Sequence, residues 1–125
     1  MSGYIRELEA AVEKLKRKDL KLKIATDWHL QPYFLTALAA RVEEELERLP
    51  KEIRESVMVL FSAHSMPKRV IDKAPNYIND LKETAKEVAK LVGLNKHRGM
   101  FCYPSAGHTT KEWLQPDFPA VMPQR

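Results

Sequence analysis

Residues 57–67 read VMVLFSAHSMP, and this stretch determines the fold class that we expect for the chain. Its first five residues are all apolar and mostly β-favouring, which is typical of a central strand in a parallel sheet covered on both faces. The run then ends on His64, set between Ser62 and Ser65, with a proline after them. Such a histidine is either a loop residue that bonds a backbone carbonyl or part of a functional site.

Amphipathic helices are expected on both sides of this strand. Apolar residues recur at spacings of three and four over residues 4–18, again after Pro32, and again after Pro75, which predicts three helices with one apolar face each. Pro32 suits the first helical turn, where its missing N–H is not needed. Gly93 suits the C-terminal cap of the third helix.

Two further segments have strand patterns. Residues 20–26, LKLKIAT, alternate apolar and lysine residues, and residues 100–103 form a short apolar run. The order α-β-α-β-α-β indicates the α/β class, with a three-layer parallel sheet and helical crossovers. Three strands are few for such a sheet, so we expect a partial domain over residues 1–118 and a flexible tail over 119–125. A homo-oligomer or a missing second domain would complete it.

The composition limits the class of protein. The chain has 125 residues, 44% of them hydrophobic and 30% charged, as expected of one soluble domain. The net charge is +4. Basic residues alternate with acidic residues along the predicted helices, which favours solvated helix faces over nucleic-acid binding. No apolar run is long enough to cross a membrane, although peripheral contact stays compatible with the sequence. The charged N-terminus and the single cysteine, Cys102, predict a reducing, cytoplasmic location.

Ligands of open parallel sheets bind at the C-terminal ends of the strands. Three predicted loops lie there, at residues 26–29, 62–65 and 104–108. His64 is the best candidate for chemistry, because a neutral imidazole offers a lone pair to a proton or a metal. His29 and His108 are weaker candidates.

Other functional groups favour a packing role. Trp28 and Trp113 fit core or rim packing, and Cys102 falls inside a strand pattern. The sequence contains no GxSxG, GxxxxGK[ST], GxGxxG or HExxH motif. Ser62 and Ser65 flank a histidine, but no acid that would complete a hydrolase triad can be identified.

Residues 60–67, LFSAHSMP, resemble the ferrochelatase signature LFSAHSLP, with Met66 as the one change. Three more segments resemble that family in order along the chain: residues 2–9 (SGYIRELE), Trp28 with Pro32 and Phe34, and residues 105–107 (SAG) with Trp113, Leu114, Pro116 and Asp117. The resemblance covers about residues 2–118.

The resemblance implies an enzyme, a lyase of haem biosynthesis that inserts ferrous iron into protoporphyrin. Iron and porphyrin are then substrates, and no cofactor is implied. The family fold has two similar α/β domains. His64 matches the active-site histidine, which either takes protons from the pyrrole nitrogens or handles the metal. Ser62, Ser65, Ser105 and Trp113 match positions in or beside the porphyrin cleft, which makes them candidate substrate-binding residues.

Several features depart from the family pattern. Residues 72–77 read DKAPNY where the family has a GDPY stretch, and Pro104 replaces a glutamine. Family proteins are more than twice as long, and the acidic partner of the histidine comes from a later segment. Asp27 and Glu112 are the substitutes that the sequence offers.

Two alternatives to an active enzyme therefore stay open. The first is a truncated, non-catalytic module that binds porphyrin, haem or metal and needs a partner or a dimer to complete the cleft. The second is an inert fragment whose sheet edge recruits a partner. Lys68 and Arg69 would supply positive charge to porphyrin carboxylates, or would simply be solvated.

Overall fold

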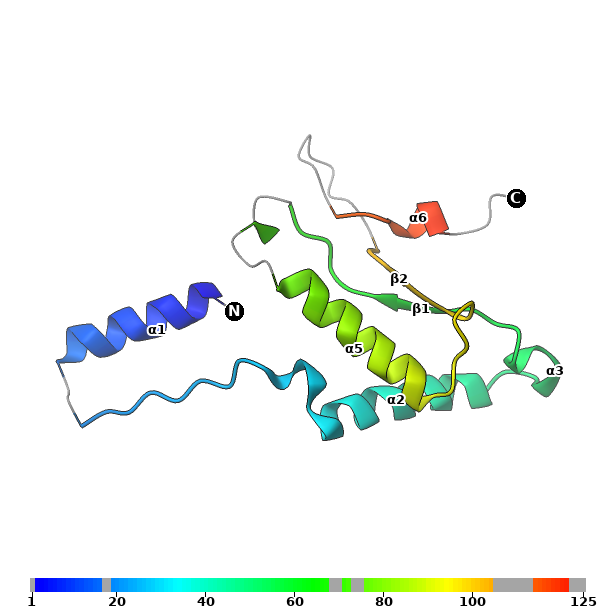
Figure 1. Ribbon diagram of the computed structural model, residues 1–125, viewed down its shortest axis with the longest axis horizontal. Helices are drawn as coiled ribbons and strands as arrows, with labels where there is room; N and C mark the ends of the chain where they lie inside the picture. The colour runs from blue at the N-terminus through cyan, green and yellow to red at the C-terminus, as the bar shows by residue number, and fades with distance from the viewer. Residues whose placement is uncertain (1, 17–18, 68–70, 73–75, 105–113, 122–125) are drawn as a thin grey trace.

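The structure is a computed structural model that describes the chain except residues 1, 17–18, 68–70, 73–75, 105–113 and 122–125 (Figure 1). Its named elements are, in order, α1 (Ser2–Leu15), the 3₁₀ helix η1 (Trp28–Leu30), α2 (Pro32–Glu47), α3 (Lys51–Arg54), β1 (Val59–Ser62), α5 (Tyr77–Leu91), β2 (Gly99–Cys102) and α6 (Phe118–Val121).

β1 and β2 form a parallel pair connected through α5. The register sets Val59 opposite Gly99 and Ser62 opposite Cys102. The approach to the sheet is fixed by Arg98, whose guanidinium donates to the backbone oxygens of Val57 at 3.2 Å and of Arg54 at 2.7 Å. The predicted parallel sheet with a helical crossover is therefore confirmed, in a mixed helix and strand fold.

Two helix ends lie where the sequence predicts them, whereas α1 covers Ser2–Leu15 rather than residues 4–18, and the short helix α3 was not predicted. α2 starts at Pro32, and α5 is followed by Gly93 in the left-handed region at φ 72°. Leu35 and Ala39 of α2 pack against Val88 of α5, and Phe61 of β1 packs against this cluster. The core thus joins α2, α5 and the sheet, which lie together in Figure 1.

The predicted strand over residues 20–26 is wrong. Among the described residues this segment has no strand partner, and it runs extended beside α1, away from the body that contains the sheet (Figure 1). Ile5 and Val12 of α1 line a shallow groove with Leu22 and Ile24. An alternating pattern marks a segment able to pair, but a strand forms only where a neighbour accepts its backbone hydrogen bonds.

The sheet is less buried than the sequence predicts. Val59, Leu60 and Phe61 are half-buried rather than fully buried, and the Met58 side chain is 50% exposed. The core helices α2 and α5 pack on the side of the sheet to which Phe61 contributes. The three-layer arrangement stays a prediction.

The last part of the chain returns to the sheet. The Tyr103 N–H donates to the Pro116 carbonyl at 2.9 Å, and Tyr103 forms an isolated parallel bridge with Asp117. Residues 118–121 then form α6, whereas 122–125 lie outside the described residues. The expected flexibility of residues 119–125 and the domain boundary at 118 stay predictions. Among the helices of the described residues, none has the length and apolar character needed to cross a membrane.

Candidate functional site

The C-terminal end of β1 carries the best candidate residues. Ser62 is the last residue of the strand and is exposed. His64 follows two residues later with an exposed side chain, and Ser65 is buried. An accessible imidazole therefore lies at the C-terminal end of the strand, where ligands of parallel sheets bind.

Ser65 is buried without a hydrogen-bond partner. Its relative exposure is 2%, and no atom of the described residues accepts from or donates to its hydroxyl. An unpaired buried hydroxyl costs about 1 to 3 kcal/mol of stability. The Ser65 hydroxyl is therefore free, among the described residues, to form a hydrogen bond with a further group.

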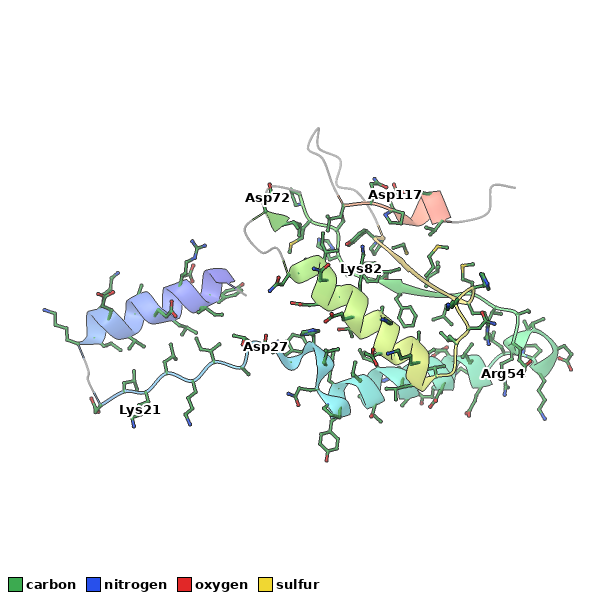
Figure 2. All side chains as sticks on the ribbon, in the orientation of Figure 1. Lys21, Asp27, Arg54, Asp72, Lys82 and Asp117 are labelled. Carbon is green, nitrogen blue, oxygen red and sulfur yellow. The ribbon has the colours of Figure 1, made fainter. Side chains whose placement is uncertain are left out.

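The acidic partner of His64 is not found among the described residues. Among the described residues, the His64 side chain forms no hydrogen bond or ion pair. Asp27 lies at the start of η1, where it accepts a hydrogen bond from the Thr26 hydroxyl at 3.0 Å (Figure 2). Glu112 lies outside the described residues. Asp27 is therefore not paired with the histidine, and the role of Glu112 stays a prediction.

The end of β2 lies next to the end of β1, since Cys102 pairs with Ser62. Cys102, Tyr103 and Leu114 are buried, and the Tyr103 ring meets Phe101 edge to face at a centroid distance of 5.3 Å. Burial raises the pKa of the Cys102 thiol. Burial, and next Tyr77, raise the pKa of the Tyr103 hydroxyl. This confirms the packing role predicted for Cys102.

Some predicted site residues lie outside the described residues. These are Ser105 and Trp113 of the proposed porphyrin cleft, together with His108, Lys68 and Arg69. Their roles stay predictions. His97, by contrast, is described and lies exposed just before β2, at the opposite end of the sheet from His64.

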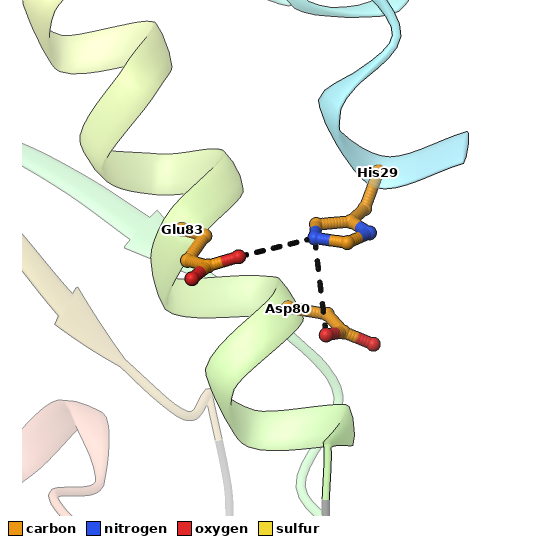
Figure 3. A group of neighbouring side chains, drawn as sticks. All are labelled: His29, Asp80 and Glu83. Atoms are coloured by element: carbon orange, nitrogen blue, oxygen red, sulfur yellow. Dashed lines mark hydrogen bonds and ion pairs between the residues drawn. The ribbon is translucent and has the colours of Figure 1, made fainter. Parts of the chain in front are cut away.

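The first predicted loop lies beside a helix rather than after a strand. The expectation that residues 26–29 follow a strand is wrong, because the described residues before them form none. Trp28 packs edge to face on Phe34 at 5.1 Å. His29 instead faces α5, with its Nε2 at 3.2 Å from Glu83 Oε2 and 3.8 Å from Asp80 Oδ1 (Figure 3).

Sequence reasoning did not identify Asp80 and Glu83. Their spacing of three along a helix places both carboxylates on one face, which is a readable signal. Their partner, His29, lies 54 residues before Glu83 in the sequence. No local pattern predicts such a contact.

Similarity to known proteins shows to which family the chain belongs. The family model described as ferrochelatase matches residues 1–124. The chain belongs to the ferrochelatase family. It is 36% identical to the ferrochelatase of Herpetosiphon aurantiacus over 94% of this chain, and 34% identical to that of Deinococcus radiodurans over 93%. It is also 30% identical, over 94% of its length, to the coproporphyrin III ferrochelatase of Bacillus subtilis.

The matched region is a limited part of these relatives. It covers 37% of the Herpetosiphon aurantiacus protein, and 36% each of the Deinococcus radiodurans and Bacillus subtilis proteins. The chain thus spans little more than a third of the length of the curated ferrochelatases that it matches.

Proposed function

We propose that this chain acts in the insertion of ferrous iron into a porphyrin, with His64 as the reacting side chain. The observation that carries the proposal is the position of the signature LFSAHSMP. Residues 60–67 cross the C-terminal end of a parallel strand and leave the His64 imidazole accessible. That placement gives the family signature the site expected of an α/β protein.

The reaction sets what His64 must do. Two pyrrole N–H protons leave the porphyrin as Fe²⁺ binds to its nitrogens, and the metal is not oxidised. A neutral imidazole either accepts one of these protons or holds the ion before transfer, and both roles use the same lone pair. Ser62, Ser65, Ser105 and Trp113 are the proposed porphyrin-binding residues.

Two porphyrins are candidate substrates. The signature implies protoporphyrin, whereas the Bacillus subtilis relative is named for coproporphyrin III. Both are flat apolar discs with carboxylates, which require an apolar slot and donors for the acids. We propose a cytoplasmic location, and a homo-oligomer or second domain that completes the slot.

A second candidate function is porphyrin binding without turnover. It is favoured by the absence of an acidic partner for His64 among the described residues and by the short span relative to the Herpetosiphon aurantiacus protein, 37%. In this function a cleft residue such as Ser65 still binds the disc, but proton removal lacks its second group.

An anaerobic titration distinguishes these functions. Ferrous iron is added to the tag-free chain with protoporphyrin or coproporphyrin III, and the metalloporphyrin absorption bands are followed. We expect metallation that falls about 10²- to 10⁴-fold in a His64→Ala variant. The matched control, His97→Ala, changes an exposed histidine at the other end of the sheet and should keep the rate.

The alternative outcomes are distinct. Bound but unmetallated porphyrin supports the binding module, and an absence of binding contradicts both functions. Metallation at an unchanged rate in His64→Ala contradicts the role of the histidine.

A further inference from the structure

We infer that His29, Asp80 and Glu83 form a binding site for a divalent first-row transition ion, separate from His64. One imidazole nitrogen and one carboxylate oxygen from each acid lie within 4.8 Å of one another. Figure 3 shows the two carboxylates on α5 and the imidazole from η1 converging on one point.

The neighbouring Thr84 side chain also supports the site, through contacts with two backbone carbonyls. The Thr84 hydroxyl lies 3.2 Å from the His29 carbonyl and 2.9 Å from the Asp80 carbonyl, so it links η1 to α5 beside the cluster. The His29 side chain is 21% exposed, which restricts its rotamers. The imidazole is thus positioned by packing before any ion binds.

The charges of the cluster favour a cation. Among the described residues, His29 is the one basic group within ion-pair distance of Asp80 or Glu83. With a neutral imidazole the cluster carries two negative charges in a small volume. A divalent ion would neutralise both, whereas a protonated imidazole neutralises one.

The distances fit a metal with one nitrogen and two oxygen ligands. Bonds of 2.0–2.2 Å in tetrahedral geometry set ligand atoms about 3.4 Å apart. The observed separations of 3.2 Å to Glu83 and 3.8 Å to Asp80 lie on either side of that value. Imidazole with carboxylates suits Zn²⁺, Co²⁺ and Fe²⁺, while Mg²⁺ and Ca²⁺ prefer oxygen ligands alone.

The simpler interpretation is a hydrogen bond that fastens η1 to α5. In that case Nε2–H of His29 donates to Glu83, and Asp80 is incidental. The two interpretations differ in a measurable way, because a hydrogen bond requires a donor at position 29, whereas a metal requires a lone pair there.

The test measures Co²⁺ binding to the tag-free full chain by its visible absorption and by calorimetry, without porphyrin. His64→Ala removes the other candidate ligand and should leave one equivalent of Co²⁺ bound. We expect Glu83→Gln, Asp80→Asn and His29→Gln each to weaken binding at least about tenfold. His29→Gln keeps an amide N–H for Glu83, so its unfolding transition in the absence of metal should stay near that of the parent chain.

The matched control is Glu87→Gln, one helical turn after Glu83, where the carboxylate pairs with Lys90. It should bind Co²⁺ like the parent chain. Bound Co²⁺ should also raise the melting temperature of the parent chain and of Glu87→Gln, but not that of Glu83→Gln. Failure of the parent chain to bind Co²⁺, or equal loss in Glu83→Gln and Glu87→Gln, would overturn the inference. Loss of binding in His64→Ala alone would assign the metal to His64 instead.

Discussion

At the scale of single residues, Ser65 is the position where stability and function are expected to conflict. Its hydroxyl is buried and unpaired among the described residues. We expect Ser65→Ala to leave the free energy of unfolding unchanged or to raise it by about 1 kcal/mol, because it removes an unsatisfied polar group. Porphyrin affinity should fall in the same variant. Urea unfolding and a porphyrin titration measure the two effects.

A contrasting serine provides the control. The Ser56 hydroxyl donates to the Ile53 carbonyl at 2.8 Å, so Ser56→Ala removes a hydrogen bond that is made. It should lower the free energy of unfolding by about 0.5 to 1 kcal/mol and leave porphyrin binding unchanged. A Ser65→Ala variant that is destabilised more than Ser56→Ala would show that Ser65 has a structural partner.

Cys102 and Tyr103 predict how stability depends on alkaline pH. Burial raises the pKa of both groups in the folded chain, above ordinary values of 9.0 and 10.0, with Tyr77 adding to the shift at Tyr103. The folded state therefore holds these protons more tightly than the unfolded state. The free energy of unfolding should be maximal below the ordinary values and should fall as the pH rises through them toward the raised ones.

Urea unfolding between neutral and strongly alkaline pH measures this dependence. The fall should be smaller in Cys102→Ala, which removes one of the two buried acids. If the fall in both Cys102→Ala and Tyr103→Phe were as steep as in the parent chain, other groups would govern the alkaline instability.

At the scale of elements, the C-terminal end of α5 depends on one glycine. Gly93 has φ 72°, and a Cβ added there would have no atom within 4 Å. A Gly93→Ala change should thus cost only backbone strain, about 1 to 2 kcal/mol of unfolding free energy. Thermal or urea unfolding measures it.

Gly99 offers a control at the start of β2. A Cβ there would lie 3.5 Å from Phe61 Cε2, an ordinary contact, and its φ lies outside the left-handed region. Gly99→Ala should therefore be tolerated better than Gly93→Ala. If the two variants were equally destabilised, the cap would not be the source of the effect.

The elements also show what the sequence can and cannot predict. Pro32 and Gly93 mark helix ends through local backbone chemistry, and the apolar stripes mark helix faces, so these features were predicted correctly. The alternation in residues 20–26 predicts a strand, but pairing depends on a partner that the segment itself does not encode. The contact of His29 with Asp80 and Glu83 was missed for the same reason, since it arises only when distant elements pack.

At the scale of the whole molecule, the functional signature and the apolar surface lie in different places. His64 follows the sheet at the C-terminal end of β1, whereas α1 and residues 20–26 extend from the body (Figure 1). Tyr4 is 76% exposed and Leu15 is 61% exposed on that extension. Exposed apolar side chains on one extension are candidates for a surface that another chain or segment covers.

This arrangement predicts that the isolated chain associates with itself. In a solution of pure protein a second copy is the available partner for the apolar side chains of α1 and residues 20–26. Leu8 and Leu22 are 47% and 41% exposed there. Sedimentation velocity at micromolar concentration should show dimers or larger species. Leu8→Lys combined with Leu22→Glu keeps the net charge and should shift the chain toward the monomer, because each variant side chain is costly to desolvate at an interface.

Tyr33→Ser is the control, since it removes an exposed aromatic residue from α2 without changing the net charge. Its sedimentation should match that of the parent chain. Far-ultraviolet circular dichroism of the double variant should keep the helical signal, because neither Leu8 nor Leu22 belongs to the core that joins α2, α5 and the sheet. A compact monomer of the parent chain, or association unchanged in the double variant, would show that this surface is not where the copies meet.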